Sequence, residues 1–187
     1  MSMLEGGNIA NVERVKIVTI EETPETHVLE TASSATFTGV VSAGAEQELR
    51  IKNTIHGMIK TEDLVKGYDI ELADQKLLLK VYALVDGGTY TPATTEPAVN
   101  EKYAAPVAGA PVNRKKFDLY LYTSDRDTDG DALAYHAWKF PSCKGKPVDG
   151  SFKDGEFATN TYKIASRPPK GVSPMTMDRI DELPEVT

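Results

Sequence analysis

The residues best suited to chemistry form an aspartate-rich run at residues 125–131, which reads DRDTDGD. The run matches the D-x-D-x-D-G opening of a calcium loop, in which alternate oxygen ligands and a glycine at the sharp turn surround Ca²⁺. A twelve-residue calcium loop closes with a glutamate, but His136 occupies that position here, inside an apparent strand. Two interpretations stay open: an acidic hairpin tip, or a weak calcium site formed by Asp125, Asp127, Asp129 and Asp131.

The other reactive residue types do not form a recognisable catalytic pattern. His27, His56 and His136 are far apart and lack the H-E-x-x-H spacing of a zinc protease, so isolated strand histidines are expected. Cys143 is the single cysteine and is expected to be a small buried apolar residue. The chain contains no G-x-S-x-G, phosphate loop or dinucleotide fingerprint. We therefore expect a β-rich structural or binding domain rather than an enzyme, with no cofactor.

Charge and composition limit the classes of partner. The 187 residues carry 21 Lys and Arg against 28 Asp and Glu, a formal net charge of −7. An acidic chain is poorly suited to gripping nucleic acid through its phosphates, although it could line a passage that repels nucleic acid. No run approaches the ~18 apolar residues of a membrane-spanning helix, so no membrane partner is expected. The start of the chain lacks the features of a secretory signal, and the lone cysteine favours assembly in a reducing cytoplasm.

The hydrophobic pattern predicts a mainly β fold. Strand-like alternation or β-branched enrichment occurs in residues 12–20, 27–42, 46–60, 68–72, 116–122, 132–140 and 155–166. In 46–60 the alternation of apolar and charged residues predicts a half-buried antiparallel strand. The expected fold class is an antiparallel β-sandwich or barrel with one flanking α-helix and long loops and arms.

The one expected helix covers about residues 74–86. Asp74 is a suitable N-cap, and Gly87 suits the left-handed position that follows a helix. The apolar residues between them recur at the spacing of one helix face, which predicts packing against a sheet: Leu77, Leu78, Val81, Leu84 and Val85.

The expected organisation is a single domain with flexible extensions. Residues 1–11 are interpreted as a flexible N-terminal arm and residues 12–187 as one β domain. Within that domain, residues 89–113 form a long loop rich in Pro and Ala, and a C-terminal arm begins at about residue 170. Loops of this length are commonly functional or disordered.

The order of several segments resembles the major tail proteins (tail tube proteins) of bacteriophages, of siphophage or prophage type. Residues 67–74 (GYDIELAD) and 77–88 (LLLKVYALVDGG) resemble their strand–helix segment. The resemblance extends over roughly residues 12–185 and includes 49–53 (LRIKN), 140–145 (FPSCKG), 151–157 (SFKDGEF), 162–168 (YKIASRP) and 180–184 (IDELP).

This resemblance implies a phage tail tube fold and a structural role in the virion. Such subunits form hexameric rings that stack into a hollow tube, through which DNA is delivered to the host without specific binding. The implied partners are other copies of the chain, the tape measure protein and the tail terminator and distal tail proteins. The implied location is the phage tail, after assembly in the bacterial host cytoplasm.

The same resemblance suggests where contacts lie. Glu46, Glu48, Arg50 and Lys52 are candidates for lining the lumen, the alternative being an outer surface facing ordinary solvent. Residues 89–113 and both termini are candidates for contacts between subunits. Alternative functions are a β-sandwich binding module with a calcium-stabilised loop, a related distal tail or terminator protein, and a bacteriocin or secretion tube subunit.

Overall fold

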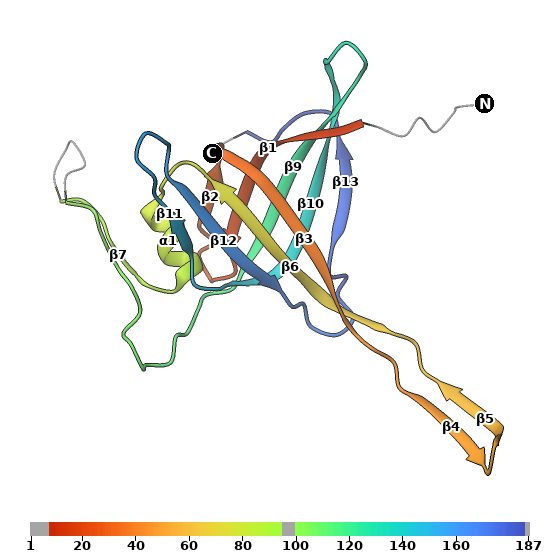
Figure 1. Cartoon of the computed structure of the whole chain (residues 1–187). Coiled ribbons are helices and arrows are strands. Elements are labelled where there is room, and N and C mark those ends of the chain that lie inside the picture. Colours follow the sequence, from red (N-terminus) through yellow and green to blue (C-terminus); the bar gives the residue numbers. More distant parts are fainter. Residues whose placement is uncertain (1–7, 95–99, 186–187) are drawn as a thin grey trace.

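A curled antiparallel sheet of nine strands forms the body of the protein (Figure 1). The computed structural model describes residues 8–94 and 100–185. The sheet follows the order β2-β1-β9-β10-β12-β6-β3, with β13 paired to β10 and β11 paired to β12. β3, β6 and β12 pass in front of β1, β9 and β10 in Figure 1, so the sheet folds over itself as a barrel-like layer. The strands are β1 Asn8–Thr19, β2 Thr26–Leu29, β3 Ala32–Ser42, β6 Leu64–Asp74, β9 Phe117–Arg126, β10 Ala132–Gly145, β11 Asp149–Ser151, β12 Thr159–Ser166 and β13 Thr176–Ile180. The expected mainly β fold is confirmed.

The hydrophobic core fills the inside of this curled sheet. On β9 the apolar residues alternate with polar ones, so Phe117, Leu119 and Leu121 all face inward and are buried. Side chains on one face of a strand lie two residues apart, which is why the pattern FDLYL produces a buried stripe. Phe37 from β3 joins this core, with its ring centroid 5.5 Å from Trp138 and 5.3 Å from Phe140. Such aromatic pairs contribute about 0.5–1.5 kcal/mol each beyond the area they bury.

Helix α1, Leu79–Asp86, packs against this sheet, but it begins later than expected. Val81 and Val85 are buried in the core, and Gly87 adopts the left-handed conformation with φ 84°, which confirms the expected helix end. The expectation that Asp74 caps the helix is wrong. Asp74 is the last residue of β6, where it lies opposite Asn160 of β12, and its carboxylate accepts a 2.6 Å hydrogen bond from Thr31. Continuation of the ladders on both sides of β6 holds residue 74 in extended backbone.

Residues 46–60 also differ from the expectation of one half-buried strand. They form a separate two-stranded hairpin, β4 Glu46–Ile51 and β5 Thr54–Lys60, and all the residues in both strands are exposed. The chain reverses at Lys52, which has φ 54°, a left-handed conformation typical of turns. The prediction of a half-buried strand is therefore wrong, because the hairpin projects from the body and both faces of its strands are exposed.

The segments expected as arms and loops contain short strands. Strands β7 Thr89–Thr91 and β8 Lys102–Ala104 pair within the loop expected at residues 89–113. Strand β1 begins at Asn8, and β13 lies in the segment expected as a C-terminal arm. The first seven residues of the expected N-terminal arm lie outside the described residues. Within the described residues, no helix has the length and apolar character needed to cross a membrane.

Candidate assembly surface

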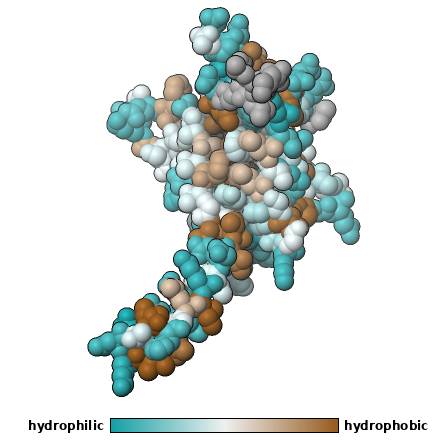
Figure 2. Space-filling model, turned by 90° about the vertical axis from the view of Figure 1, so that its right-hand side faces the viewer, coloured by the Kyte–Doolittle hydropathy of each residue, from teal (hydrophilic) through white to brown (hydrophobic). Residues whose placement is uncertain are grey.

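The most unusual surface of the protein is a projecting arm. The arm consists of the β4–β5 hairpin, residues 46–60, and of residues 40–45 and 61–66, which connect it to the body. Figure 1 shows it extending far from the curled sheet. In Figure 2 the arm reaches to the lower left, and apolar side chains gather on it.

The apolar side chains of this arm are largely exposed to solvent. Leu49, Met58 and Ile59 have exposed fractions of 60%, 57% and 67%. A two-stranded hairpin is marginally stable in water at best, and contiguous exposed apolar residues commonly mark an interaction site. The arm therefore has the composition of a surface that becomes buried against another molecule. The other large exposed apolar residues of the arm are Val41, Ile51, Ile55, Leu64 and Val65.

The four residues expected to line a lumen all lie on or beside this hairpin. Glu46 and Glu48 lie opposite Lys60 and Met58 of β5. Arg50 follows a register irregularity and has its guanidinium 4.0 Å from the carboxylate of Glu48. Lys52 lies at the hairpin turn. The structure thus brings the four together on one exposed element, and their role as lumen residues stays a prediction.

Close contacts at the base of the hairpin restrict its direction. The backbone N–H of Gly44 donates a 2.7 Å hydrogen bond to the carboxylate of Asp63, and the N–H of Ala45 donates to the hydroxyl of Thr61 at 2.7 Å. A Cβ atom on Gly44 would lie only 1.7 Å from the backbone oxygen of Thr61, so no larger residue fits there without movement.

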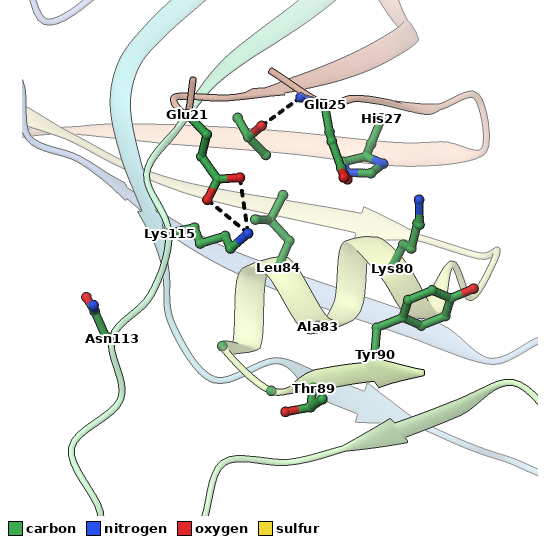
Figure 3. Close-up of a pocket in the computed structure, with 13 residues that line it drawn as sticks. Glu21, Glu25, His27, Lys80, Ala83, Leu84, Thr89, Tyr90, Asn113 and Lys115 are labelled. Atoms are coloured by element: carbon green, nitrogen blue, oxygen red, sulfur yellow. Dashed lines mark hydrogen bonds and ion pairs between the residues drawn. The ribbon is translucent and has the colours of Figure 1, made fainter. Parts of the chain in front are cut away.

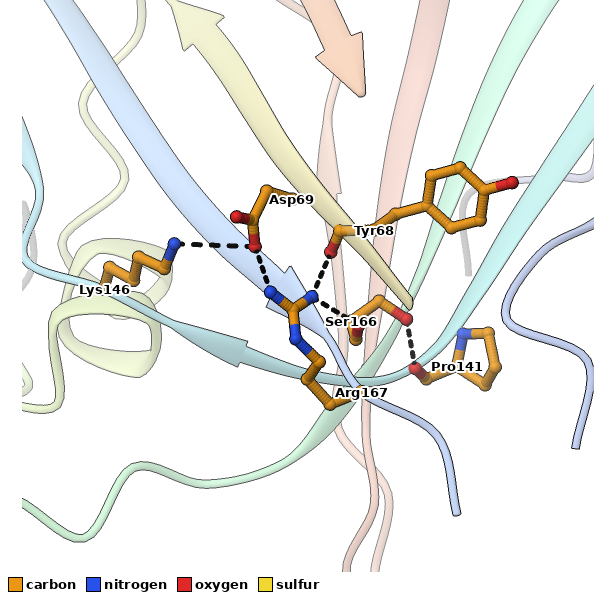
Figure 4. A network of polar contacts seen from close by, with 6 residues as sticks. All are labelled: Tyr68, Asp69, Pro141, Lys146, Ser166 and Arg167. Atoms are coloured by element: carbon orange, nitrogen blue, oxygen red, sulfur yellow. Dashed lines mark hydrogen bonds and ion pairs between the residues drawn. The ribbon is translucent and has the colours of Figure 1, made fainter. Parts of the chain in front are cut away.

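An ionic network lies where β6 meets β12 (Figure 4). The guanidinium of Arg167 contacts the Asp69 carboxylate at 2.7 Å and donates hydrogen bonds to the backbone oxygens of Tyr68 and Ser166 at 2.9 and 2.8 Å. The ammonium of Lys146 lies 3.5 Å from Asp69. Burial raises the pKa of Asp69, but Arg167 and Lys146 outweigh that effect and the net result is a lowered pKa. The network connects β6 to the ends of β12 and β10, close to the point where the arm leaves the body.

The aspartate-rich run divides into two parts in the structure. Asp125 is 3% exposed at the end of β9, where one carboxylate oxygen lies 3.7 Å from the guanidinium of Arg179. Asp127 begins the β9–β10 turn, and its carboxylate accepts hydrogen bonds from the backbone N–H groups of Asp129 and Asp131 at 3.0 and 2.9 Å. In residues 8–94 and 100–185, no group of three or more His, Cys, Asp or Glu is arranged to hold a metal ion. Calcium binding by this run stays a prediction for a direct measurement.

Cys143 lies in the core, as its interpretation as a buried apolar residue anticipated. Burial raises the pKa of its thiol to about 12, and the thiol donates a 3.2 Å contact to the backbone oxygen of Phe140. A thiol with so high a pKa remains protonated at neutral pH and is a poor nucleophile.

A groove lies between the β1–β2 turn, helix α1 and strand β7 (Figure 3). Its volume is about 370 Å³. Two of its carboxylates already have partners: Glu21 pairs with Lys115 at 2.9 Å, and Glu25 lies 3.5 Å from the ring of His27. Burial is the main cause of a lowered pKa at His27, which favours the neutral imidazole. The groove does not bring together a nucleophile, a base and an oxyanion donor, so its geometry gives no support to a catalytic site.

Sequence reasoning missed the projecting arm, although a signal for it was present. Ile55, Met58 and Ile59 do not keep a period of two, so both faces of β5 carry apolar residues. A strand with one buried face keeps its apolar residues on that face. Apolar residues on both faces of an otherwise charged hairpin therefore indicate contact with something outside the body.

Comparisons with known proteins give only distant likenesses. No protein-family model matches the chain, and no curated protein matches it. A chain of the anti-feeding prophage (AFP) baseplate has 9% identity and a TM-score of 0.43, with 93% of this chain and 97% of that chain covered. A chain of the PVC sheath–tube complex, from an extracellular contractile injection system in the extended state, has 14% identity and a TM-score of 0.43, with 91% of each chain covered. A chain of the AFP tube-terminating cap has 12% identity and a TM-score of 0.41, with 95% of each chain covered.

Proposed function

We propose that this chain is a structural subunit that assembles with copies of itself into the hollow tail tube of a phage or phage-derived particle. The observation that carries this proposal is the projecting arm with its exposed apolar side chains. The likeness of residues 67–88 and 140–184 to tail tube proteins gives the assembly its form: stacked rings, hexameric by analogy.

The edges of the sheet support self-association. Among the described strands, β2 and β3 end the main sheet order, so each has one edge without a paired strand. Such edges add strands from neighbouring chains unless they are covered, and closure into a ring removes them. β3 is 11 residues long, which is enough for an extended ladder of hydrogen bonds with a neighbouring strand.

The charge of the chain suits a passage for DNA. A net charge of −7 per subunit repels a polyanion, and repulsion reduces sticking while DNA moves. Within this proposal Glu46, Glu48, Arg50 and Lys52 line part of the lumen. Residues 89–113 and the termini contact neighbouring rings, the tape measure protein or the distal tail and terminator proteins.

The experiment is negative-stain electron microscopy of the concentrated protein, with and without EDTA. The proposal expects tubes of uniform width with an axial repeat, and it expects a folded monomer when residues 47–59 are replaced by Asn-Gly. The matched control is Leu77→Glu, which changes an exposed apolar residue outside the arm and should leave tubes intact. Normal tubes from the chain without its hairpin would overturn the proposal.

A second variant tests the contribution of the loop at residues 89–113 separately from that of the arm. Replacing residues 92–101, between β7 and β8, with a two-residue turn keeps the paired strands and removes the tip of the expected contact loop. The proposal expects this variant to fold and not to polymerise. If it forms normal tubes, the loop is not an inter-subunit contact.

A further inference from the structure

Two surfaces of opposite charge lie at the two ends of strand β9. Lys116 immediately precedes the strand and Asp127 immediately follows it. Ten residues of strand span roughly 33 Å at about 3.3 Å per residue. Figure 1 shows the β9–β10 turn at one end of the body and the start of β9 at the other. This separation is several times the Debye length of about 8 Å at physiological salt, so the two surfaces hardly neutralise each other within one copy.

The basic surface is a groove of about 320 Å³ at the start of β9. Four cationic residues and one carboxylate line it, and that carboxylate, Glu21, is already paired with Lys115 at 2.9 Å. Across residues 8–94 and 100–185, Lys116 and Lys144 have no carboxylate within 4.0 Å, and both are exposed. The groove lining consists of Ile20, Glu21, Asn113, Arg114, Lys115, Lys116 and Lys144.

The acidic surface is the protruding turn at residues 127–131. Asp129 and Asp131 are exposed, and in the described part of the chain neither has a cationic group within 4.0 Å. The turn holds a defined shape, because the Asp127 carboxylate accepts two backbone N–H groups of the same turn. Nothing lies within 4 Å of a Cβ built on Gly130, so the tip is open to a partner.

We propose that the acidic turn of one copy docks into the basic groove of a second copy, head to tail. Charge complementarity selects this occupant: the groove has unpaired cations, and the same chain presents unpaired carboxylates on a narrow protrusion. Because the two surfaces lie at opposite ends of one strand, the first copy keeps a free groove and the second copy keeps a free turn after docking. Such heterologous contacts continue from copy to copy and produce stacks.

This contact deepens the proposed function, on which it rests for the presence of many copies. It differs from the arm contact in its chemistry, since it is polar and sensitive to salt whereas the arm is apolar. It also gives the aspartate-rich run a role that requires no metal.

The test is disulfide trapping between two partners, each of which carries one introduced cysteine. One chain carries Thr128→Cys on the acidic turn and the other carries Asn113→Cys beside the groove, and both positions are exposed. Both chains also carry Leu49→Thr, Met58→Thr and Ile59→Thr, which weakens the apolar contact of the arm. Native Cys143 is buried and does not compete. The mixture is oxidised in low salt with EDTA, and the disulfide-linked heterodimer is quantified on a non-reducing gel.

The expected result is a heterodimer in excess of both homodimers. Adding Lys116→Glu and Lys144→Glu to the Asn113→Cys chain should reduce its yield roughly tenfold, because attraction becomes repulsion. Adding Asp129→Lys and Asp131→Lys to the Thr128→Cys chain should then restore the heterodimer yield. The matched control, Lys76→Glu with Lys80→Glu, makes the same charge change at two exposed lysines outside the groove and the arm, and it should preserve the yield.

Three results would overturn the proposal: no excess of heterodimer, an equal loss with the control pair, or no recovery in the charge-swapped mixture. Because the arm contact is weakened in both chains, these results are independent of tube formation by the wild-type protein. Failure of the proposed function and failure of this contact are therefore observed in separate experiments.

Discussion

Replacing Leu49, Met58 and Ile59 with threonine should weaken self-association strongly and leave the body folded. Threonine keeps a high β propensity, so the hairpin retains its backbone preference while losing apolar surface. Full burial of a Leu, Ile or Met side chain contributes about 1.5–3 kcal/mol. Since these residues expose 60%, 57% and 67% of their surface, their complete burial in an assembly contributes about 3–5 kcal/mol together.

That free energy corresponds to a change of roughly 100-fold or more in the concentration at which assembly begins. The assay is sedimentation over a concentration series, with the pelleted fraction examined by electron microscopy. The melting temperature of the unassembled chain, followed by circular dichroism, serves as the control. It should hardly change, because the arm has no contact with the core at these positions. Unchanged assembly, or loss of the folded body, would refute the reasoning that the arm is an intermolecular surface.

Three further predictions concern the body and the turn. The Cys143 thiol, with its pKa raised to about 12, should react with a thiol reagent at pH 8 only after denaturant is added; rapid reaction of the native chain would contradict its burial. Asp69→Asn should destabilise the fold at pH 7 by less than about 1 kcal/mol, since the pair is partly exposed. Because the pKa of Asp69 is lower in the folded protein than its usual value of 3.8, the contribution of Asp69 to stability is present above pH 3.8 and is lost as the pH falls below that value. The melting temperatures of the wild type and of Asp69→Asn should therefore converge in acid. If residues 125–131 bind calcium, CaCl₂ should raise the melting temperature and EDTA reverse the rise, whereas an acidic hairpin tip predicts no response.

Much of the body could be predicted from local pattern. The alternating residues of 116–122 and 132–140 became β9 and β10, because a period of two places one set of side chains in the core. An acidic hairpin tip was one of the two interpretations of residues 125–131; the turn between the strands lies there, and Gly130 adopts φ 91°. Helix α1 and its end at Gly87 followed from the apolar stripe and from the freedom of glycine at positive φ.

The errors occurred where two structures compete for one segment. Asp74 has a side chain suited to a helix N-cap, yet strand pairing with β3 and β12 keeps it in β6. Residues 46–52 alternate as a half-buried strand would, yet residues 46–60 fold back on themselves and leave the body. Local preference cannot decide the case of Asp74, because its strand pairs with residues distant in the sequence. The hairpin pairs locally, but its position outside the body depends on where the rest of the chain lies.

The amino-acid sequence was sufficient for the fold class, the acidic charge, the strand pattern of the body and the acidic turn, since each depends on neighbouring residues. The direction of the arm, the burial of Asp125 away from Asp129 and Asp131, and the groove that joins Lys116 to Lys144 came from the fold. Lys116 and Lys144 are neighbours only because β9 and β10 run antiparallel, which brings the start of one strand beside the end of the other. Surfaces of this kind depend on how distant segments are brought together, and a reading of local pattern contains no information on that arrangement.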